Sequence, residues 1–419
     1  MKLKASALYM VIIIALVIAV ICSSLIVAAY FYRLQYQNSF KYNTLQLNLG
    51  SATNILLTDT SYAYQDGRTT DLFKQQSDSV FLRRIPWGIL DIGIACAFSK
   101  SDTLYNVFSI GKEIDSARWS ALYVIDQDRP ISVSGKTLIK GDAYLPKPGI
   151  REAYLENRGY EGDKRLVIGK IKNSARELPV LSPQRVALLR QILDTAFPRS
   201  TSTLLTDSNS FRSTLKYIYL GKSAVTLNDI SLQGNIMIVS DTTITIGTDA
   251  RLDNVIISAR KIIVDNDFHG RCQLFAKDTL SIGERCVFTY PSCLATMRFH
   301  PRVNSRAVLH IGKRTVINGT VLLWQDFVSE PSPILELTEN AKVVGQIYSQ
   351  GAFSYKEGTV INGSLYTSRF LYQTVYSAYE NYLVGSTIDA SKLSRYYLTG
   401  MLLPASGPKN KIMQWLEKK

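Results

Sequence analysis

AKVVGQIYS, from Ala341, and TVINGSLYT, from Thr359, are two stretches of nearly the same pattern that follow each other at an 18-residue interval. In both stretches apolar residues alternate with other residues, and a glycine stands at the fifth position. Alternation with a period of two predicts a β-strand. Strands that recur at a fixed longer interval are typical of chains that stack one turn on the next. This repeat decides the fold class, and the question is how far along the chain it extends.

The 18-residue interval continues upstream of Ala341. Apolar residues follow one another at this interval from Ile246 to Ile282 and again from Leu337 to Tyr355. Two longer steps connect the two runs, and their extra residues include prolines and polar side chains, as loops do. We therefore expect one interior column of stacked side chains, formed by Ile246, Val264, Ile282, Ile311, Leu337 and Tyr355.

The predicted fold class is mainly β: a β-solenoid (β-helix) of about 7–8 rungs, with a single N-terminal transmembrane helix and a partly helical insertion. Residues 131–146 match residues 335–350 at a constant offset of 204, so we assign them as the first rung. The predicted domains are 1–33 for a cytoplasmic tip and transmembrane helix, 34–60 for a helical stalk, 61–130 for a mixed α/β cap, 131–146 for the first rung, 147–220 for an insertion with a helix, 221–370 for the β-solenoid and 371–419 for a C-terminal helical cap.

Two segments outside the repeat are predicted to be helical. In SPQRVALLRQILDTAF, apolar residues recur at helical spacing, and Ser182 and Pro183 suit the first positions of a helix. The tail KNKIMQWLEKK, from Lys409, is basic and amphipathic. We expect this tail to fold over the last rung, because an exposed strand edge invites pairing with other chains.

The N-terminus carries a long apolar segment, residues 5–32, with no charge between Lys4 and Arg33. As a helix it would extend about 42 Å, more than the ~30 Å hydrocarbon core of a bilayer. A cleaved signal peptide has a shorter apolar region, and this one ends in three aromatic residues that suit a membrane interface. We therefore predict an uncleaved single-pass anchor. The lysines that precede it predict a cytoplasmic N-terminus and an extracytoplasmic bulk, in the periplasm or at the cell surface.

The composition is that of a folded protein, with 46% hydrophobic and 20% charged residues and a net charge of +14. A basic surface attracts nucleic acid, anionic lipid or anionic glycan, or is simply solvated. The predicted topology puts that surface outside the cytoplasm and argues against nucleic acid. The expected partners are the lipid bilayer through the N-terminal helix, envelope proteins or an anionic glycan, and further copies of the chain.

The five cysteines do not have the spacing of a zinc site. Cys22 lies in the predicted span, and Cys272 and Cys286 fall on interior positions of the repeat. An oxidising compartment would allow disulfides. Their pairing stays open among Cys96, Cys272, Cys286 and Cys293.

One polar cluster, DNDFHG, is a candidate site. If the segment is a strand, Asp265, Asp267 and His269 share its outward face, opposite Val264 and Phe268. Paired carboxylates with a histidine could bind a metal or perform acid–base chemistry, whereas such clusters are more often solvated turns. No nucleophile motif, phosphate loop or nucleotide fingerprint occurs in the sequence. We predict no catalytic, cofactor-binding or metal-binding residue.

The segment LTENAKVVGQIYSQGAFSYKEGTVINGSLYT, residues 337–367, resembles the rungs of bactofilins, the polymer-forming β-solenoid scaffold proteins of bacteria. The resemblance implies a scaffold role with neither cofactor nor catalytic residues. Bactofilins are small and lack long insertions, so the insertion at 147–220 is a departure from that family. Such a departure would hinder free end-to-end polymerisation.

The N-terminus resembles a type IV pilin or pseudopilin in its short basic leader, long apolar helix and polar helical continuation. It lacks the glycine and the glutamate that pilins carry around their processing site, because the sequence from Lys4 to Leu8 reads KASAL. An ordinary signal anchor explains the same pattern.

Three functions remain from these observations. The leading prediction is a non-catalytic, membrane-anchored extracytoplasmic β-solenoid that acts as an envelope scaffold or assembly component. The second is a carbohydrate-binding or carbohydrate-active β-helix protein, because the 24 tyrosines, 15 phenylalanines and 4 tryptophans could stack on sugars or fill the core. The third is a pilin-like appendage subunit.

Overall fold

The computed structural model describes residues 4–59, 61, 63–72, 79–99, 102–194, 206–301, 305–374, 376–404 and 406–418. Strands account for 50% of the structure and helices for 17%, which confirms a mainly β protein with one long N-terminal apolar helix. The chain forms two compact units, and each is described by itself. The first comprises Met1–Arg83, Ile94–Asn106 and Lys418–Lys419, and the second comprises Arg84–Gly93 and Val107–Glu417.

The first unit is built on helix α1, Lys4–Thr58, which is continuous over 55 residues. It contains no proline that would break the backbone hydrogen bonds. The predicted anchor and the predicted stalk are therefore one helix. Described side chains before Thr44 are exposed, and its apolar part is long and apolar enough to cross a membrane, which fits a single-pass anchor.

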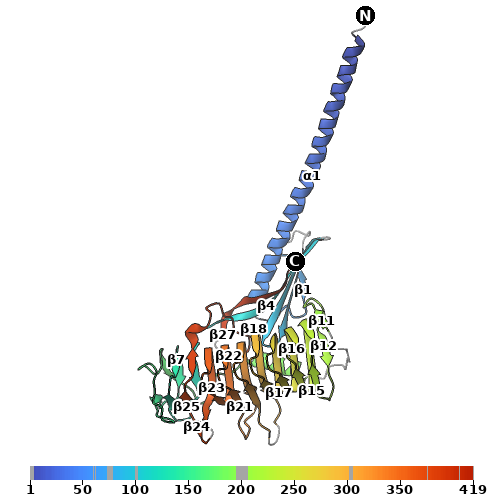
Figure 1. The fold of residues 1–419 in the computed structure, drawn as a ribbon. Helices are drawn as coiled ribbons and strands as arrows, with labels where there is room; N and C mark the ends of the chain where they lie inside the picture. Colours follow the sequence, from blue (N-terminus) through green and yellow to red (C-terminus); the bar gives the residue numbers. More distant parts are fainter. Residues whose placement is uncertain are drawn as a thin grey trace. The chain divides into compact units, whose positions relative to one another are not determined.

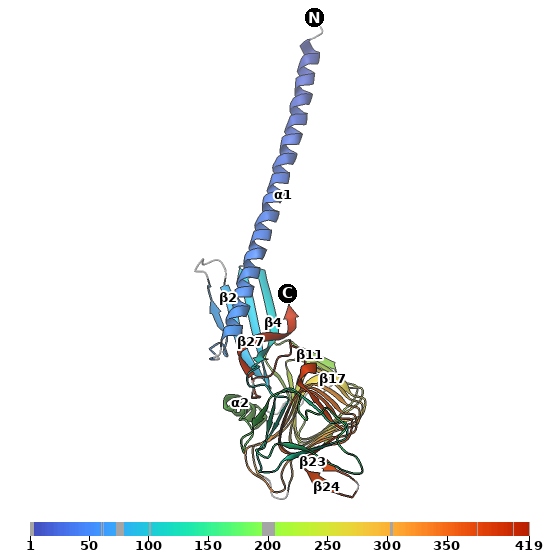
Figure 2. The ribbon, with the colours of Figure 1, turned by 90° about the vertical axis from the view of Figure 1, so that its left-hand side faces the viewer.

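The C-terminal part of α1 buries one face. Leu45, Leu49, Ala52 and Leu56 are spaced three or four residues apart, as one side of a helix requires, and all are buried. Figure 2 shows this part of α1 lying along the strands of the unit. The Asn106 side-chain amide donates a hydrogen bond to the Thr53 hydroxyl at 3.5 Å, within the same unit. Burial of this face, rather than helix propensity, holds the end of the helix in place.

A five-stranded sheet follows α1, in the order β1-β2-β3-β4-β27. No helix occurs among the described residues between 61 and 130, so the predicted mixed α/β cap is wrong and the segment is β. Its residues form short alternating runs, which are enough for strands but too short for a helical face. The strands are β1 (Arg68–Thr70), β2 (Ser79–Trp87), β3 (Leu90–Ser99), β4 (Asp102–Ile114) and β27 (Ser406–Lys418).

The prediction of a C-terminal helical cap over 371–419 is also wrong. The tail is strand β27, and Asp389 caps a single 3₁₀ turn, Ala390–Lys392, instead of a helix. Trp415 packs edge-on against Phe108 of β4, with ring centroids 5.5 Å apart. The physical reason is that β4 would otherwise present an open edge, and the tail satisfies its backbone groups.

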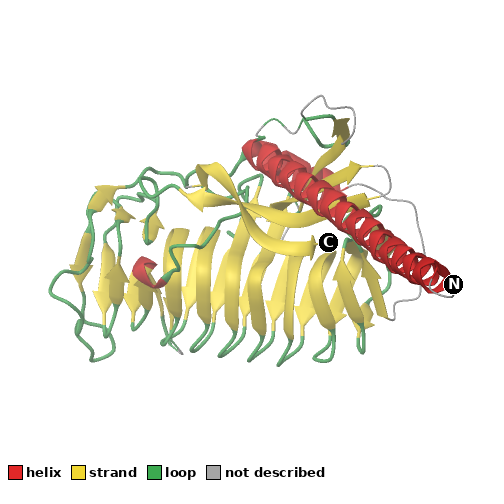
Figure 3. Ribbon diagram, turned by 90° about the horizontal axis from the view of Figure 1, so that it is seen from above, coloured by secondary structure: helices red, strands yellow, loops and turns green. Residues whose placement is uncertain are grey.

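The second unit is a stack of parallel strands. Figures 1 and 3 show the strands from β15 to β23 side by side. Most turns keep the 18-residue interval; Thr243 of β15, for example, pairs with Lys261 of β16, and Lys261 pairs with Thr279 of β17. The strands are β15 (Ile236–Ile246), β16 (Arg251–Val264), β17 (His269–Ile282), β18 (Val287–Arg298), β19 (Val308–Ile311), β20 (Val316–Gln325), β21 (Ile334–Leu337), β22 (Lys342–Tyr355) and β23 (Val360–Gln373).

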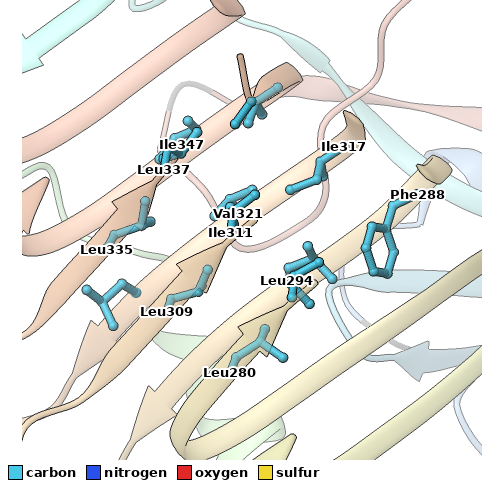
Figure 4. Packing of buried hydrophobic residues seen from close by; sticks show 14 of the residues in the cluster. Leu280, Phe288, Leu294, Leu309, Ile311, Ile317, Val321, Leu335, Leu337 and Ile347 are labelled. Atoms are coloured by element: carbon cyan, nitrogen blue, oxygen red, sulfur yellow. The ribbon is translucent and has the colours of Figure 1, made fainter. Parts of the chain in front are cut away.

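The six residues of the predicted column are register partners in succession. The two longer steps fall between β18 and β19 and between β20 and β21, where the predicted loops lie. Figure 4 shows the interior side chains of neighbouring turns packed together, among them those of Leu309, Ile311, Leu335 and Leu337. The pairs run from Ile246 to Val264, Ile282, Ile311, Leu337 and Tyr355, and all six side chains are buried.

Residues 131–146, which were predicted to form the first turn of the stack, lie at its C-terminal end. β7 pairs with β26, which itself pairs with β23, so residues 131–146 lie beyond the last long turn and not before β15. The match between residues 131–146 and 335–350 showed that both have the pattern of one turn of the stack. It did not show which turn residues 131–146 pack against. The strands here are β5 (Leu122–Val124), β6 (Ile131–Ser134), β7 (Leu138–Lys140), β8 (Ala143–Leu145), β24 (Ala378–Glu380), β25 (Tyr382–Val384) and β26 (Thr387–Asp389).

The insertion runs from this end of the stack to the other. The helix predicted after Ser182 is present as α2, Pro183–Asp194. The stack then begins with short strands, and β13 pairs with β15 at a slightly longer step, from Val225 to Ile244. The remaining strands are β9 (Ile150–Glu152), β10 (Ile171–Asn173), β11 (Thr206–Asn209), β12 (Lys216–Tyr219), β13 (Val225–Leu227) and β14 (Ser231–Gly234).

Candidate functional site

The predicted polar cluster is a corner of the stack and not a strand face. Strand β16 ends at Val264 and β17 begins at His269, so Asp265 and Asp267 lie in the turn between them. All three cluster residues are exposed, whereas Phe268 is buried. The prediction that they point outward therefore agrees with the structure, but the strand that was to align them is absent.

Asp267 has a structural partner in the next turn. Its backbone is left-handed, with φ of 62°, and its carboxylate accepts two hydrogen bonds of 2.7 Å from Arg285. Hydrogen bonding and the charge of Arg285 lower the pKa of Asp267. A carboxylate held charged in this way is a poor general acid. The arrangement is that of an ion pair that ties two turns together.

The same corner carries a continuous ladder of backbone hydrogen bonds. At each step, the N–H of a left-handed corner residue donates to a carbonyl of the next turn, with φ values between 56° and 78°. Asparagine, aspartate and glycine tolerate this conformation best. The ladder therefore gives the polar residues at this corner a structural role. The donors are Asp267, Arg285, Arg314, Asn340 and Gly358, and the acceptors are Glu284, Lys313, Glu339, Glu357 and Gly385.

A shallow groove of about 480 Å³ lies beside this corner, and Asp267 and His269 contribute to its lining with Asp229 and Asp249. Within the described residues, no group of three or more histidine, cysteine, aspartate or glutamate side chains could hold a metal ion. Nor does any disulfide join the cysteines of the described chain, and Cys272, Cys286 and Cys293 are buried. Burial raises the pKa of the Cys272 and Cys293 thiols, which makes them poor nucleophiles.

A larger groove, of about 680 Å³, gathers carboxylates and tyrosines that sequence reasoning missed. We call it the Tyr376 groove; Glu357, Tyr372 and Tyr376 line it. Arg158 donates two hydrogen bonds to Glu357, at 3.0 and 3.1 Å, and the Tyr372 hydroxyl donates a third at 3.3 Å. Burial, followed by the charge of Glu357, raises the pKa of Tyr372 to about 12.

Two of the three carboxylates that line the Tyr376 groove have structural partners. A glycosidase needs a carboxyl group that is free to act as an acid. Arg158 and Tyr372 both donate hydrogen bonds to Glu357, and Glu339 forms an ion pair with Lys313 at 3.2 Å. Glu357 and Glu339 are therefore occupied in structural contacts, and Glu156 is the third carboxylate of the lining. Their convergence from separate turns left no mark in the sequence, because residues 156 and 357 lie far apart in it.

A third groove, of about 620 Å³, presents aromatic rings and basic groups together, and we call it the Trp119 groove. Trp119 follows a turn in which its N–H donates to the Asp115 carbonyl at 2.8 Å. Tyr396 is 78% exposed, and the Arg395 guanidinium lies over its ring, 5.3 Å from the centroid. Lys411 forms an ion pair with Glu113 in the same lining and lowers the pKa of that carboxyl.

Two tyrosines that are neighbours in the sequence have opposite exposure at this groove. Tyr396 faces solvent, whereas Tyr397 is buried and its hydroxyl donates to the Gly319 carbonyl at 3.4 Å. Burial raises the pKa of Tyr397 well above its usual value. The turn that holds both begins at Ser394, whose carbonyl accepts the Tyr397 N–H at 2.9 Å. Tyr397 thus anchors the turn, and Tyr396 is left as an exposed platform.

A buried charge cluster lies under α2, and no pattern in the sequence indicated it. Asp91 is fully buried and accepts hydrogen bonds from Arg84, at 2.8 Å, and from Arg185 of α2. Arg185 also donates to the carbonyls of Gly88 and Leu90, at 3.3 and 3.1 Å. Every one of these groups belongs to the second unit. The cluster connects α2 to the β2–β3 hairpin.

No family model, curated protein or solved structure matches the chain.

Proposed function

We propose that the chain is a membrane-anchored, non-catalytic β-solenoid that acts as a scaffold or assembly component of a cell envelope. The observation that carries the proposal is the continuous parallel pairing of the second unit, from β13 through β23 to β26 and β7. A stack of this kind offers a long, rigid outer surface on which other molecules can be arranged. The charged side chains at its corner, such as those of Asp267 and Arg285, form ion pairs between neighbouring turns.

The pairing pattern supports a solenoid over a barrel. In an up-and-down barrel, each strand pairs with its neighbours in sequence. Here β17 pairs with β19, β18 with β20 and β19 with β21, so the strands of one turn lie against those of the next. The repeat interval then corresponds to one turn, and the interior column to the core of the coil.

The bactofilin-like rungs support a scaffold role, but the ends of the stack argue for a different use. β5 and β26 both pair with β23, so the C-terminal edge is already covered. Covered edges do not accept the strand of another chain. At its C-terminal end the stack would therefore offer another chain only short strands, which favours the lateral surface as the part of the scaffold that binds partners.

The proposed location follows from α1. The helix is long and apolar enough to span a bilayer, and two lysines precede its apolar part. By the positive-inside rule, the N-terminus would be cytoplasmic and the remainder of the chain extracytoplasmic. The proposed partners are then the bilayer and proteins or glycans of the envelope.

In-cell photo-crosslinking tests the scaffold proposal. A photoreactive amino acid is placed at Val328 or Tyr376, two of the most exposed side chains of the stack, and adducts are identified by mass spectrometry. We expect one dominant protein adduct from at least one position. The same probe at the buried Ile347 serves as the matched control and should give no adduct. Glycan adducts, or a diffuse set of proteins from both positions, would contradict the proposal.

The Trp119 groove favours a second candidate, the binding of an anionic glycan. An exposed tyrosine ring with a stacked guanidinium suits the face of a sugar and its carboxylate or sulfate group. Arg395 and Lys411 supply positive charge beside that ring. Tyr396→Ala and Arg395→Gln should each weaken binding of a uronic acid or sulfated polysaccharide by roughly tenfold. Tyr376→Ala, at an even more exposed tyrosine of another groove, is the control.

The continuity of α1 favours a third candidate, a pilin-like appendage subunit. The resemblance implies an apolar helix that continues without a break into a polar one, and α1 does so over 55 residues. Pilins are processed near the start of that helix. The mass of the mature protein tests this candidate, because removal of the first few residues would support it and an intact Met1 would contradict it.

A further inference from the structure

The Trp119 groove holds a carboxylate among its cations. Its charged lining consists of Glu113, Arg395 and Lys411, beside the rings of Trp119 and Tyr396. Its volume of about 620 Å³ lies in the range of sites that hold small molecules. A groove built only to attract negative charge would not present Glu113 to its ligand, because a carboxylate repels an anion. The mixture of charges therefore discriminates between classes of anionic glycan.

Arg395 and Tyr396 form the part of the groove that suits a sugar acid. Arg395 is exposed and, among the residues that the structure describes, forms no ion pair. Its guanidinium group lies 5.3 Å from the centroid of the Tyr396 ring. A guanidinium group binds a carboxylate through two parallel hydrogen bonds, and an exposed tyrosine ring offers an apolar surface to the face of a sugar. One sugar unit that carries a carboxylate would contact both side chains.

Glu113 offers a different kind of contact. Its carboxylate is 34% exposed and forms an ion pair with Lys411 through Oε1. The hydrogen bond from Lys411 lowers the pKa of this carboxyl, so Glu113 is ionised at neutral pH. An ionised carboxylate is only an acceptor, and its two oxygens can receive hydrogen bonds from neighbouring hydroxyl groups. Glu113 therefore suits the hydroxyl groups of a sugar and repels a sulfate group.

The ion pair of Glu113 and Lys411 is not needed to join its two strands. Glu113 belongs to β4 and Lys411 to β27, and the two strands are already neighbours in the five-stranded sheet through their backbones. Lys411 is 56% exposed, and an ion pair this open to solvent adds little to stability. A role in the selection of a ligand accounts for the position of Glu113 in the lining.

We propose that the Trp119 groove binds one uronic acid unit of a polysaccharide and that Glu113 determines this specificity. The sugar carboxylate binds Arg395, the face of the sugar lies on Tyr396, and the sugar hydroxyls donate hydrogen bonds to Glu113. A heavily sulfated glycan is disfavoured, because it brings sulfate groups to Glu113 in place of hydroxyls. The proposal rests on the glycan-binding candidate of the proposed function, and it selects uronic acids over sulfated glycans.

The binding of three polysaccharides to the full chain in nanodiscs tests the proposal. The probes are polygalacturonate, its methyl ester and dextran sulfate, and the affinities are measured by isothermal titration calorimetry. Arg395→Gln should weaken binding of polygalacturonate roughly tenfold but change binding of the methyl ester less than about twofold, because the ester has no carboxylate. Glu113→Gln should weaken binding of both roughly fivefold, because a neutral amide accepts weaker hydrogen bonds than a carboxylate. The same variant should strengthen binding of dextran sulfate roughly fivefold, because it removes a repulsive charge.

Glu339→Gln is the matched control. It removes the same charge from a glutamate that pairs with Lys313 at 3.2 Å and lines the Tyr376 groove, and it should change none of the three affinities. If Glu113→Gln strengthened polygalacturonate and dextran sulfate equally, or changed no affinity, the selection by Glu113 would be overturned. A wild-type chain that binds none of the probes, or that binds them equally well after Tyr396→Ala, would contradict glycan binding at this groove. A failure of the proposed function is therefore distinguishable from a failure of the selection.

Discussion

At Gly345 the backbone of one turn approaches the turn before it so closely that no side chain fits. Its φ is 146°, and a Cβ atom would lie 1.9 Å from the Gly319 carbonyl oxygen. Gly363 repeats the same relation to Gly345. The Tyr397 hydroxyl fills the space beside this column, 3.0 Å from the same Cβ position. The glycine that marked the sequence repeat is therefore a steric requirement of the stack.

Replacement of this glycine gives a sharp residue-scale prediction. Gly345→Ala should lower the free energy of unfolding by about 3 kcal/mol or more, because it adds a backbone clash to an unfavourable φ. Gly149→Ala is the control for the backbone alone, since its φ is 76° but nothing lies within 4 Å of a Cβ. Gly149→Ala should lower the free energy of unfolding by about 1 kcal/mol. Urea unfolding of both variants measures the difference, and equal costs would contradict close contact at Gly345.

The pair of His310 and Glu336 predicts a dependence on pH. The His310 ring, 3.2 Å away, holds the pKa of the Glu336 carboxyl below its usual value. A lowered pKa adds stability above the usual glutamate value of about 4.3, and that stability is lost as the pH falls through the lowered pKa. Both groups are part exposed, so the contribution is below about 1 kcal/mol.

Glu336→Gln should flatten the acid side of the stability profile. His310→Gln should produce the same change, and the double variant should add nothing further, because both remove one interaction. Urea midpoints between pH 3 and pH 6 provide the measurement. Additive effects of the two variants would show that the groups act separately.

At the scale of elements, α2 carries two arginines in different environments, one buried and one half-exposed. Arg185 is buried against Asp91, whereas Arg190 forms a half-exposed ion pair with Asp326 at 3.6 Å. Arg185→Met should lower the free energy of unfolding by about 3 kcal/mol, because it leaves buried polar groups without a partner. Arg190→Met should change it by less than about 1 kcal/mol. Similar losses from both would contradict the role given to the buried cluster.

The elements also show what a sequence pattern can and cannot predict. The long apolar run and the cap at Ser182 and Pro183 are local signals, and both helices are present. The tail from Lys409 has an amphipathic pattern that fits a helix, but pairing with β4 decides its structure. Such pairing depends on a partner about 300 residues away, which no local pattern reveals.

At the scale of the whole molecule, the repeat predicted the register of the stack because one interior column recurs in every turn. Ile246 and Val264 are partners at the interval read from the sequence. The order of turns was not predictable, since residues 131–146 have the pattern of a turn but lie beside β26. The grooves were missed for the same reason: Arg158 and Glu357 meet only after the ends of the stack are assembled.

The register of neighbouring turns is the central claim, and paired cysteines test it most directly. Register partners in adjacent strands lie about 4.8 Å apart, which is within reach of a disulfide. Residues that are separated by two turns are too far apart for one. Glu336 pairs with His310 on one side and with Ser354 on the other. Oxidation should therefore link His310→Cys to Glu336→Cys, and Glu336→Cys to Ser354→Cys, but not His310→Cys to Ser354→Cys. A disulfide in the third variant, or none in the first two, would contradict the stack.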